Sequence, residues 1–165
     1  MILPKLAGLM ILAALAVLMV LLVPPERIRA LLPFGLIFGV GLPFAVIGVM
    51  QNWLGYWTYH QVDLVTLAGI PVFLSVAWFP AVIIFAHLLV QYRSPLLRLL
   101  LWLAIAVAVT LLQHALSVNN MLSLQNWSSG GTFILTLLIH AGLAAALHFM
   151  GHLDLRDLFK TYERR

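Results

Sequence analysis

Long apolar runs, separated by short polar segments, make up most of this chain. A helix needs roughly 20 apolar residues to cross a hydrocarbon core about 30 Å thick. Five runs come close to or exceed that length. We therefore predict an all-α, polytopic integral membrane protein with five transmembrane helices in one domain, residues 1–151. The predicted spans cover residues 6–23, 31–50, 64–90, 96–116 and 132–150.

The segment from 152 to 165 follows a different pattern. Its apolar residues recur at the i, i+3, i+4 and i+7 spacing of one helix face, and charged residues take the opposite face. This pattern predicts a C-terminal amphipathic helix that lies on the membrane surface. The apolar positions are Leu155, Leu158, Phe159 and Tyr162.

Composition supports a membrane location. Of the 165 residues, 64% are hydrophobic, and the mean hydropathy is +1.08. A soluble domain of this length cannot bury so much apolar surface. The net charge of +4 comes from residues outside or at the ends of the apolar runs, so it indicates membrane orientation rather than nucleic-acid binding. The absence of cysteine excludes disulfides and thiolate metal sites.

Basic residues divide the connecting segments into two classes. Arginines occur between the first two spans, between the third and fourth, and in the tail, whereas the loops 51–63 and 117–131 contain no Lys or Arg. Basic loops stay in the cytoplasm. The distribution predicts a protein of the cytoplasmic membrane with its N-terminus outside and its C-terminus inside. Only Lys5 departs from this pattern.

Aromatic residues and one acid gather after the second span. Their rings have one polar edge and favour the membrane–water interface, so we expect an outer aromatic belt. Asp63 directly precedes the third predicted span and is expected to cap that helix. An alternative gives Asp63 and His60 a catalytic role at the outer face. The expected belt residues are Trp53, Tyr56, Trp57 and Tyr59.

Small residues mark two helix-packing surfaces. Gly35 and Gly39 form a GxxxG pattern in the second span, and Gly142 and Ala146 repeat the spacing in the fifth. Glycine lets a neighbouring helix approach closely, which gives dispersion contacts in a medium that offers no hydrophobic driving force. We expect these four residues to lie at helix–helix contacts.

Prolines within the second and third spans predict bent helices. Pro43, Pro71 and Pro80 each remove a backbone hydrogen bond from a predicted helix. Bends in two adjacent helices open space between them, so these residues predict a cavity inside the bundle.

Histidines are the candidate cofactor ligands. His87 and His148 lie at similar depths in the cytoplasmic halves of the third and fifth spans, and His140 lies near the middle of the fifth. Two imidazoles at one depth could ligate a haem b, and a single histidine suits a quinone carbonyl. The alternative is that each ring bonds a backbone carbonyl or a neighbouring helix. No group of residues predicts a metal site.

Two resemblances rest on particular segments. "PERIRALLPFGLIFGVGL" and "GIPVFLSVAWFPAVIIFAH" resemble small multi-pass membrane proteins of bacteria, a grouping with no attached function. "GYWTYHQVDLVTLAGIPVFLSVAW" is similar to a segment of membrane-bound lycopene cyclases and related carotenoid-biosynthesis proteins. In that pattern acidic residues follow Gly-Ile-Pro, where Val72, Phe73 and Leu74 stand here. The resemblance implies an isoprenoid-binding cavity without the cyclase acids.

Together these features favour a non-catalytic accessory or scaffold subunit. It would pack against other membrane protein subunits or a second copy of itself within the lipid bilayer, and it could hold lipid or an isoprenoid such as a carotenoid. The first alternative is an electron-transfer subunit with haem b or quinone. The second is a membrane enzyme of isoprenoid metabolism.

Overall fold

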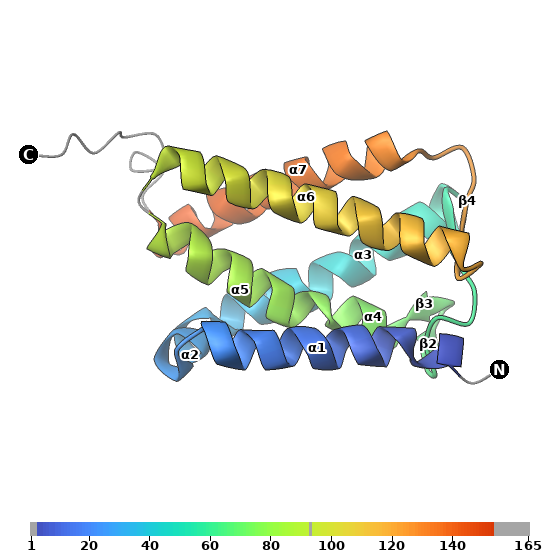
Figure 1. Ribbon diagram of the computed structural model, residues 1–165, viewed down its shortest axis with the longest axis horizontal. Coiled ribbons are helices and arrows are strands. Elements are labelled where there is room, and N and C mark those ends of the chain that lie inside the picture. The colour runs from blue at the N-terminus through green and yellow to red at the C-terminus, as the bar shows by residue number, and fades with distance from the viewer. Residues whose placement is uncertain (1–2, 93, 154–165) are drawn as a thin grey trace, which may run out of the picture.

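Long apolar helices run side by side and are closed at one end by two small sheets (Figure 1). The computed structural model describes residues 3–92 and 94–153. The predicted surface helix therefore lies almost entirely outside the described residues. The chain enters at the end that carries the strands, and α7 (Ser129–Phe149) finishes at the opposite end.

Most of the helices follow one another with short connections, and the longer connections 54–71 and 119–128 contain the strands. The long second helix is continuous and includes two π-helical segments, η2 and η3. In chain order the helices are η1 (Leu3–Leu6), α1 (Ala7–Leu22), α2 (Pro25–Phe34), η2 (Gly35–Gly41), α3 (Leu42–Gly48), η3 (Val49–Trp53), α4 (Val72–Val76), α5 (Trp78–Gln91), α6 (Pro95–Val118) and α7.

Four helices are long and apolar enough to cross a membrane, which agrees with an all-α membrane protein. They cover Pro25–Trp53, Val72–Gln91, Pro95–Val118 and Ser129–Phe149 among the described residues. Helix α1 is a shorter apolar helix of 16 residues. At 1.5 Å per residue it is about 24 Å long, so the count of five spans stays a prediction.

The second helix begins earlier than the sequence pattern indicates. It starts at Pro25 rather than at residue 31. Proline is favoured at the first helical position because its fixed φ suits the helix and its missing N–H would be unsatisfied there. Glu26 in the first turn also complements the helix dipole. Glu26, Arg27 and Arg29 are therefore helical residues, not loop residues.

Prolines in the second and third long helices coincide with irregular hydrogen bonding. Pro43 follows η2, where the Leu42 N–H bonds the Ile37 carbonyl five residues back. Pro80 follows the one-residue break at Ala77 that separates α4 from α5. Proline cannot donate to the carbonyl four residues before it. The backbone adjusts locally at both positions.

The third predicted span, 64–90, is helical only from Val72. Its first residues form a hairpin in which β2 (Thr66–Leu67) pairs with β3 (Ile70–Pro71). Ala68 and Gly69 at the turn both have positive φ, 51° and 79°, the geometry of a two-residue hairpin loop. Pro71, expected as a kink inside this helix, lies directly before it.

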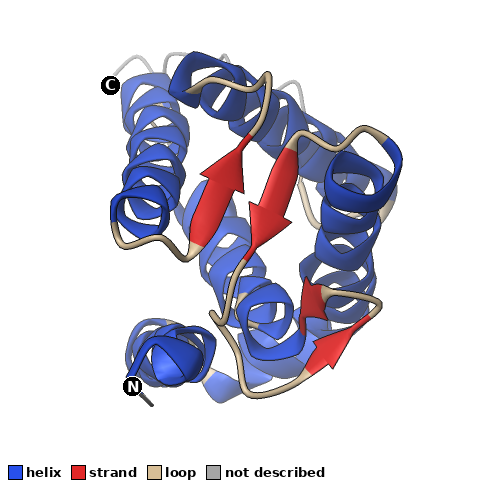
Figure 2. Cartoon of the chain, turned by 90° about the vertical axis from the view of Figure 1, so that its right-hand side faces the viewer, coloured by secondary structure: helices blue, strands red, loops and turns tan. Residues whose placement is uncertain are grey.

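A second sheet joins the two loops that contain no Lys or Arg. Strand β1 (Trp57–Tyr59) pairs with β4 (Leu122–Leu124) in antiparallel register, with Thr58 opposite Ser123. Figure 2 shows this pair lying across the end of the helices. The prediction of an all-α chain did not include these strands, although Trp-Thr-Tyr and Leu-Ser-Leu both alternate with period two.

Helix α5 is the centre of the packing. Its residues Ile83, Phe85 and Leu89 are fully buried in a cluster with Phe34 of the second helix and Leu147 of α7. A second apolar cluster lies under the β1–β4 sheet and includes Ile47, Trp57, Leu116 and Leu122.

Glycines bring the second helix close to α5. A Cβ on Gly39 would lie 2.6 Å from the Phe79 Cα and 3.1 Å from the Phe79 nitrogen. A Cβ on Gly35 would lie 2.7 Å from the Ile83 Cδ1. The Gly35–Gly39 pair therefore contacts a helix of the same chain. Gly39 lies against backbone, which cannot rotate away.

Replacing Gly39 with Ala is expected to destabilise the bundle. The added methyl group forces η2 and α5 apart, and overpacking of this kind costs about 1–3 kcal/mol. The melting temperature in mild detergent should fall by several degrees. Gly41→Ala is the matched control, because the nearest atom to a Cβ there is 4.0 Å away. Equal melting temperatures for the two variants would contradict the close contact.

Candidate functional site

Asp63 is a buried carboxylate at the strand end of the bundle. It is 6% exposed, and its Oδ2 accepts a hydrogen bond from the Leu74 N–H at 2.9 Å. Leu74 lies in the first turn of α4, where the N–H groups have no partner within the helix. Asp63 provides the acceptor, although it lies nine residues before the first residue of α4. The sequence predicted capping by Asp63 but placed the helix start at residue 64.

The second oxygen of Asp63 has no partner within the described part of the chain. Oδ1 is buried and faces Gly8, where a Cβ would overlap it. The Gly8 N–H donates to the Val62 carbonyl at 3.0 Å, which holds the two segments together. Burial raises the pKa of the Asp63 carboxyl, and hydrogen bonds from the Leu74 and Phe73 N–H groups oppose this shift with smaller effect.

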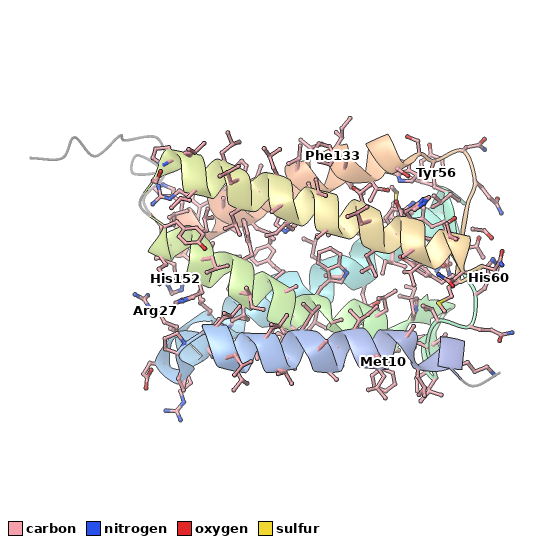
Figure 3. The ribbon with its side chains drawn as sticks, viewed as in Figure 1. Met10, Arg27, Tyr56, His60, Phe133 and His152 are labelled. Carbon is pink, nitrogen blue, oxygen red and sulfur yellow. The ribbon has the colours of Figure 1, made fainter. Side chains whose placement is uncertain are left out.

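His60 and Asp63 face different surroundings. His60 is exposed, its side chain extends from the strand end (Figure 3), and its Nε2 lies 2.9 Å from the Ser123 Oγ. Asp63 is buried and bonded to the start of α4. The arrangement does not bring the imidazole and the carboxylate together for shared acid–base work.

Most of the expected belt aromatics pack into the protein. Trp53 is 82% exposed, whereas Trp57 is 6% exposed. Tyr56 is half-buried, and its ring stacks on Trp127 at 5.3 Å. Tyr59 is also half-buried. These rings fill the space under the β1–β4 sheet, and only Trp53 has the exposure expected of an interfacial anchor.

A polar chain not anticipated from the sequence connects this aromatic layer to the helices. The Trp127 Nε1–H donates to the Thr132 Oγ1 at 2.8 Å, and the Thr132 hydroxyl donates to the Gln113 Oε1. Thr132 and Gln113 are buried. The hydrogen bonds link α6 to α7 in surroundings where an unsatisfied polar group is costly.

At the opposite end of the bundle, His87 lines a polar cavity of about 330 Å³ with Arg27, Gln91 and His152. Arg27 and His152 lie at the end away from the strands (Figure 3). His148, the expected second haem ligand, does not line this cavity, and its Nδ1 lies 2.9 Å from the Leu153 carbonyl oxygen. The described residues contain no group of three or more His, Asp or Glu side chains able to hold a metal ion.

A groove of about 320 Å³ lies between α1 and α6, with α4 and α5 at its base. In Figure 1, α5 lies between these two helices. The lining is almost entirely apolar. The side chains on the two flanks include Leu15, Leu18, Leu22, Leu101, Ile105 and Leu112.

His140 is the one ionisable side chain in the lining of this groove. It lies near the middle of α7, is 3% exposed, and its Nδ1 lies 2.8 Å from the Thr136 carbonyl oxygen. Its ring meets the Phe85 ring edge-on, with centroids 4.7 Å apart. The sequence singled out His140, but nothing in it indicated that α1 and α6 would flank it, because those helices are far apart along the chain.

A smaller cavity lies nearer the sheet. It has a volume of about 100 Å³ and is lined by Pro43 and Trp78 among other residues. The structure thus contains a cavity between the second long helix and α5, where the prolines predicted one. The larger groove shares the lining residues Leu74, Trp78 and Val82 with this cavity and extends from them to α1.

Asp63→Asn should raise stability at neutral pH relative to the wild type. The folded-state pKa of Asp63 is raised above its unfolded value of about 3.9, so its favourable contribution is complete below that value and is lost as pH rises through the folded-state pKa. Asn keeps an oxygen acceptor for Leu74 and carries no charge. The difference in melting temperature between Asp63→Asn and wild type should therefore grow as pH rises from about 4.

Asp63→Ala provides the contrasting variant. It leaves the Leu74 N–H without its acceptor and should destabilise the protein at every pH, by about 1–3 kcal/mol. If Asp63→Asn instead lowered the melting temperature by an amount that grew as pH rose from about 4, the carboxylate would stabilise the fold as a charge, and burial would not raise its pKa.

Comparison with known proteins gives no match: no family model, no curated protein and no solved structure is significantly similar to this chain.

Proposed function

We propose that this protein is a non-catalytic membrane subunit that associates with another transmembrane helix through the outer face of α7. The partner is a helix of another membrane protein or of a second copy of this chain. The observation that carries the proposal is Gly142, which is exposed and has no atom within 4 Å of a Cβ built on it.

Gly142 belongs to an outward-facing stripe. Ile134 and Leu138 are 59% and 65% exposed, and with Gly142 they occupy positions i, i+4 and i+8 of one helix face. Ala141 is exposed beside Gly142, and Ala145 is half-buried one turn further along. We call these five residues the α7 stripe. Its larger side chains flank a shallow region of small ones.

Small residues on a membrane-exposed helix favour close contact with another helix. Lipid chains are as apolar as leucine, so helices associate in a bilayer through van der Waals packing, which improves when backbones approach closely. The Gly35–Gly39 pair is already used by α5 within this chain. Gly142 would allow an equally close helix contact on the outer surface of α7.

The available acidic groups favour a non-catalytic role. Within residues 3–92 and 94–153 the acidic side chains are Glu26 and Asp63, and Asp63 is engaged with the start of α4. General acid–base catalysis needs a titratable group placed against a substrate. The electron-transfer alternative has less support, since the lining of the cavity beside His87 does not include His148.

We further infer a cytoplasmic-membrane location with the strand end outside. Arg27, Arg29 and Arg98 all lie in helices that begin at the end away from the strands. Under the positive-inside rule this end faces the cytoplasm. The N-terminus is then outside and α7 ends inside. Lys5 is the described basic residue at the strand end.

Gly142→Leu should abolish association without destabilising the subunit. Leucine projects into open space and blocks close approach of a partner helix. Wild-type protein extracted from its host membranes in lipid nanodiscs should have a mass above the 18.3 kDa of one chain, and the variant should run as a single chain with an unchanged melting temperature.

Val107→Leu is the control, because Val107 is 47% exposed on α6, outside the α7 stripe. It should keep the wild-type assembly. A Gly142→Leu variant that retained the wild-type mass would contradict association through α7.

Single-cysteine labelling can test the orientation, because the chain contains no cysteine. Gln125 is exposed after β4, and Glu26 is exposed at the start of α2. A membrane-impermeant maleimide should label Gln125→Cys in intact cells and Glu26→Cys only after permeabilisation. The reverse result would place the strand end in the cytoplasm.

A further inference from the structure

The groove between α1 and α6 combines an apolar lining with one buried polar side chain. Of the side chains that line it, only those of His140 and Trp78 carry a nitrogen or oxygen atom. The indole N–H of Trp78 is a donor only. His140 is therefore the one lining side chain with a lone pair to offer, and it is 97% buried within the bundle, as its 3% exposure shows.

The hydrogen bond at Nδ1 fixes which role the other ring nitrogen plays. A carbonyl oxygen only accepts, so the contact between the Thr136 carbonyl and Nδ1 requires Nδ1 to carry the proton. A second proton would charge the ring deep in an apolar bundle, which is costly. The ring is then neutral and Nε2 is an acceptor. Among the described residues no hydrogen bond is formed to Nε2.

The length of the groove suits an extended chain. Ile11, Leu15, Leu18 and Leu22 line it from α1 at positions i, i+4, i+7 and i+11 of one face. At about 1.5 Å per residue these positions extend over roughly 16 Å, more than half of a hydrocarbon core about 30 Å thick. Such a surface favours a long apolar molecule lying along the helices.

We propose that the groove binds a lipid alcohol, a long apolar chain whose hydroxyl group donates a hydrogen bond to the His140 Nε2. The apolar flanks bind the chain, and the acceptor selects the head group. A chain ending in a ketone or an ether has no proton to donate and leaves Nε2 unsatisfied. This site goes beyond the association proposed above and does not depend on it.

The test uses the full chain in phosphatidylcholine nanodiscs, whose lipid carries no hydroxyl group. The probe is dodecan-1-ol with a photoreactive diazirine in mid-chain, and labelled residues are identified by mass spectrometry. We expect saturable labelling of α1 and α6 residues in the groove. Dodecan-1-ol should compete, whereas 2-dodecanone and dodecyl methyl ether should compete about three- to tenfold less well, the range expected for one hydrogen bond.

Variants separate the hydroxyl contact from the shape of the groove. His140→Leu should remove the preference for the alcohol, and His140→Gln, which keeps an acceptor oxygen, should retain part of it. Leu18→Trp should fill the groove from α1 and block labelling without touching His140. Leu21→Trp is its control, because Leu21 is 74% exposed and does not line the groove.

Three results would overturn the proposal. Equal competition by the alcohol, ketone and ether would exclude hydroxyl recognition. Equal labelling of the Leu18→Trp and Leu21→Trp variants would exclude the groove. Labelling that never saturates would mean that only bulk lipid contacts these helices. None of these results depends on the oligomeric mass, so failure here is distinguishable from failure of association through α7.

Discussion

The close contact between η2 and α5 is the constraint on which the rest of the bundle depends. Gly39 lies against the Phe79 backbone, and Gly35 lies against the Ile83 side chain. No hydrophobic effect drives helices together in lipid, so close packing at such points supplies much of their attraction. Because α5 is held here, its other sides are left for α1, α6 and α7.

At the strand end, the two sheets provide hydrogen-bond partners for the non-helical backbone that connects the long helices. Every N–H and C=O near the hydrocarbon region needs a partner. The β1–β4 pair provides partners for two loops at once, and the His60 N–H and Gln125 N–H extend the ladder by bonding the Met121 and Tyr56 carbonyls. The Asp63 carboxylate accepts the Leu74 N–H in the first turn of α4, and the side chain is buried where these loops meet the helices.

Periodicity and length predicted the features that depend on local sequence. The predicted spans 96–116 and 132–150 lie within three residues of the observed ends of α6 and α7. Polar residues or turn-forming residues bound each of these apolar runs, so the local sequence marks where the helix begins and ends. The helix starting at Val72 was misplaced, because an apolar run does not show whether its first residues will continue a helix or turn back as a hairpin. Gly69, which adopts positive φ without strain, and Pro71, which disfavours helical backbone in the residue before it, held that information.

Contacts between segments far apart in the sequence could not be predicted from periodicity and length. His140 was recognised as unusual, but its surroundings depend on where α1 and α6 settle, and no local pattern specifies that. The burial of Trp57 likewise depends on pairing with a strand far along the chain. The spacing of Thr132, Thr136 and His140 at i, i+4 and i+8 was a usable clue, because all three are buried on one face of α7.

Helix α7 therefore reverses the arrangement of a helix in a soluble protein. Its buried face carries Thr132, Thr136 and His140, while its outer face carries apolar and small residues. His140 and Gly142 are two residues apart, about 200° around the helix at 3.6 residues per turn. A ligand bonded to His140 and a helix packed on Gly142 would use opposite sides of one rigid element, so neither would block the other.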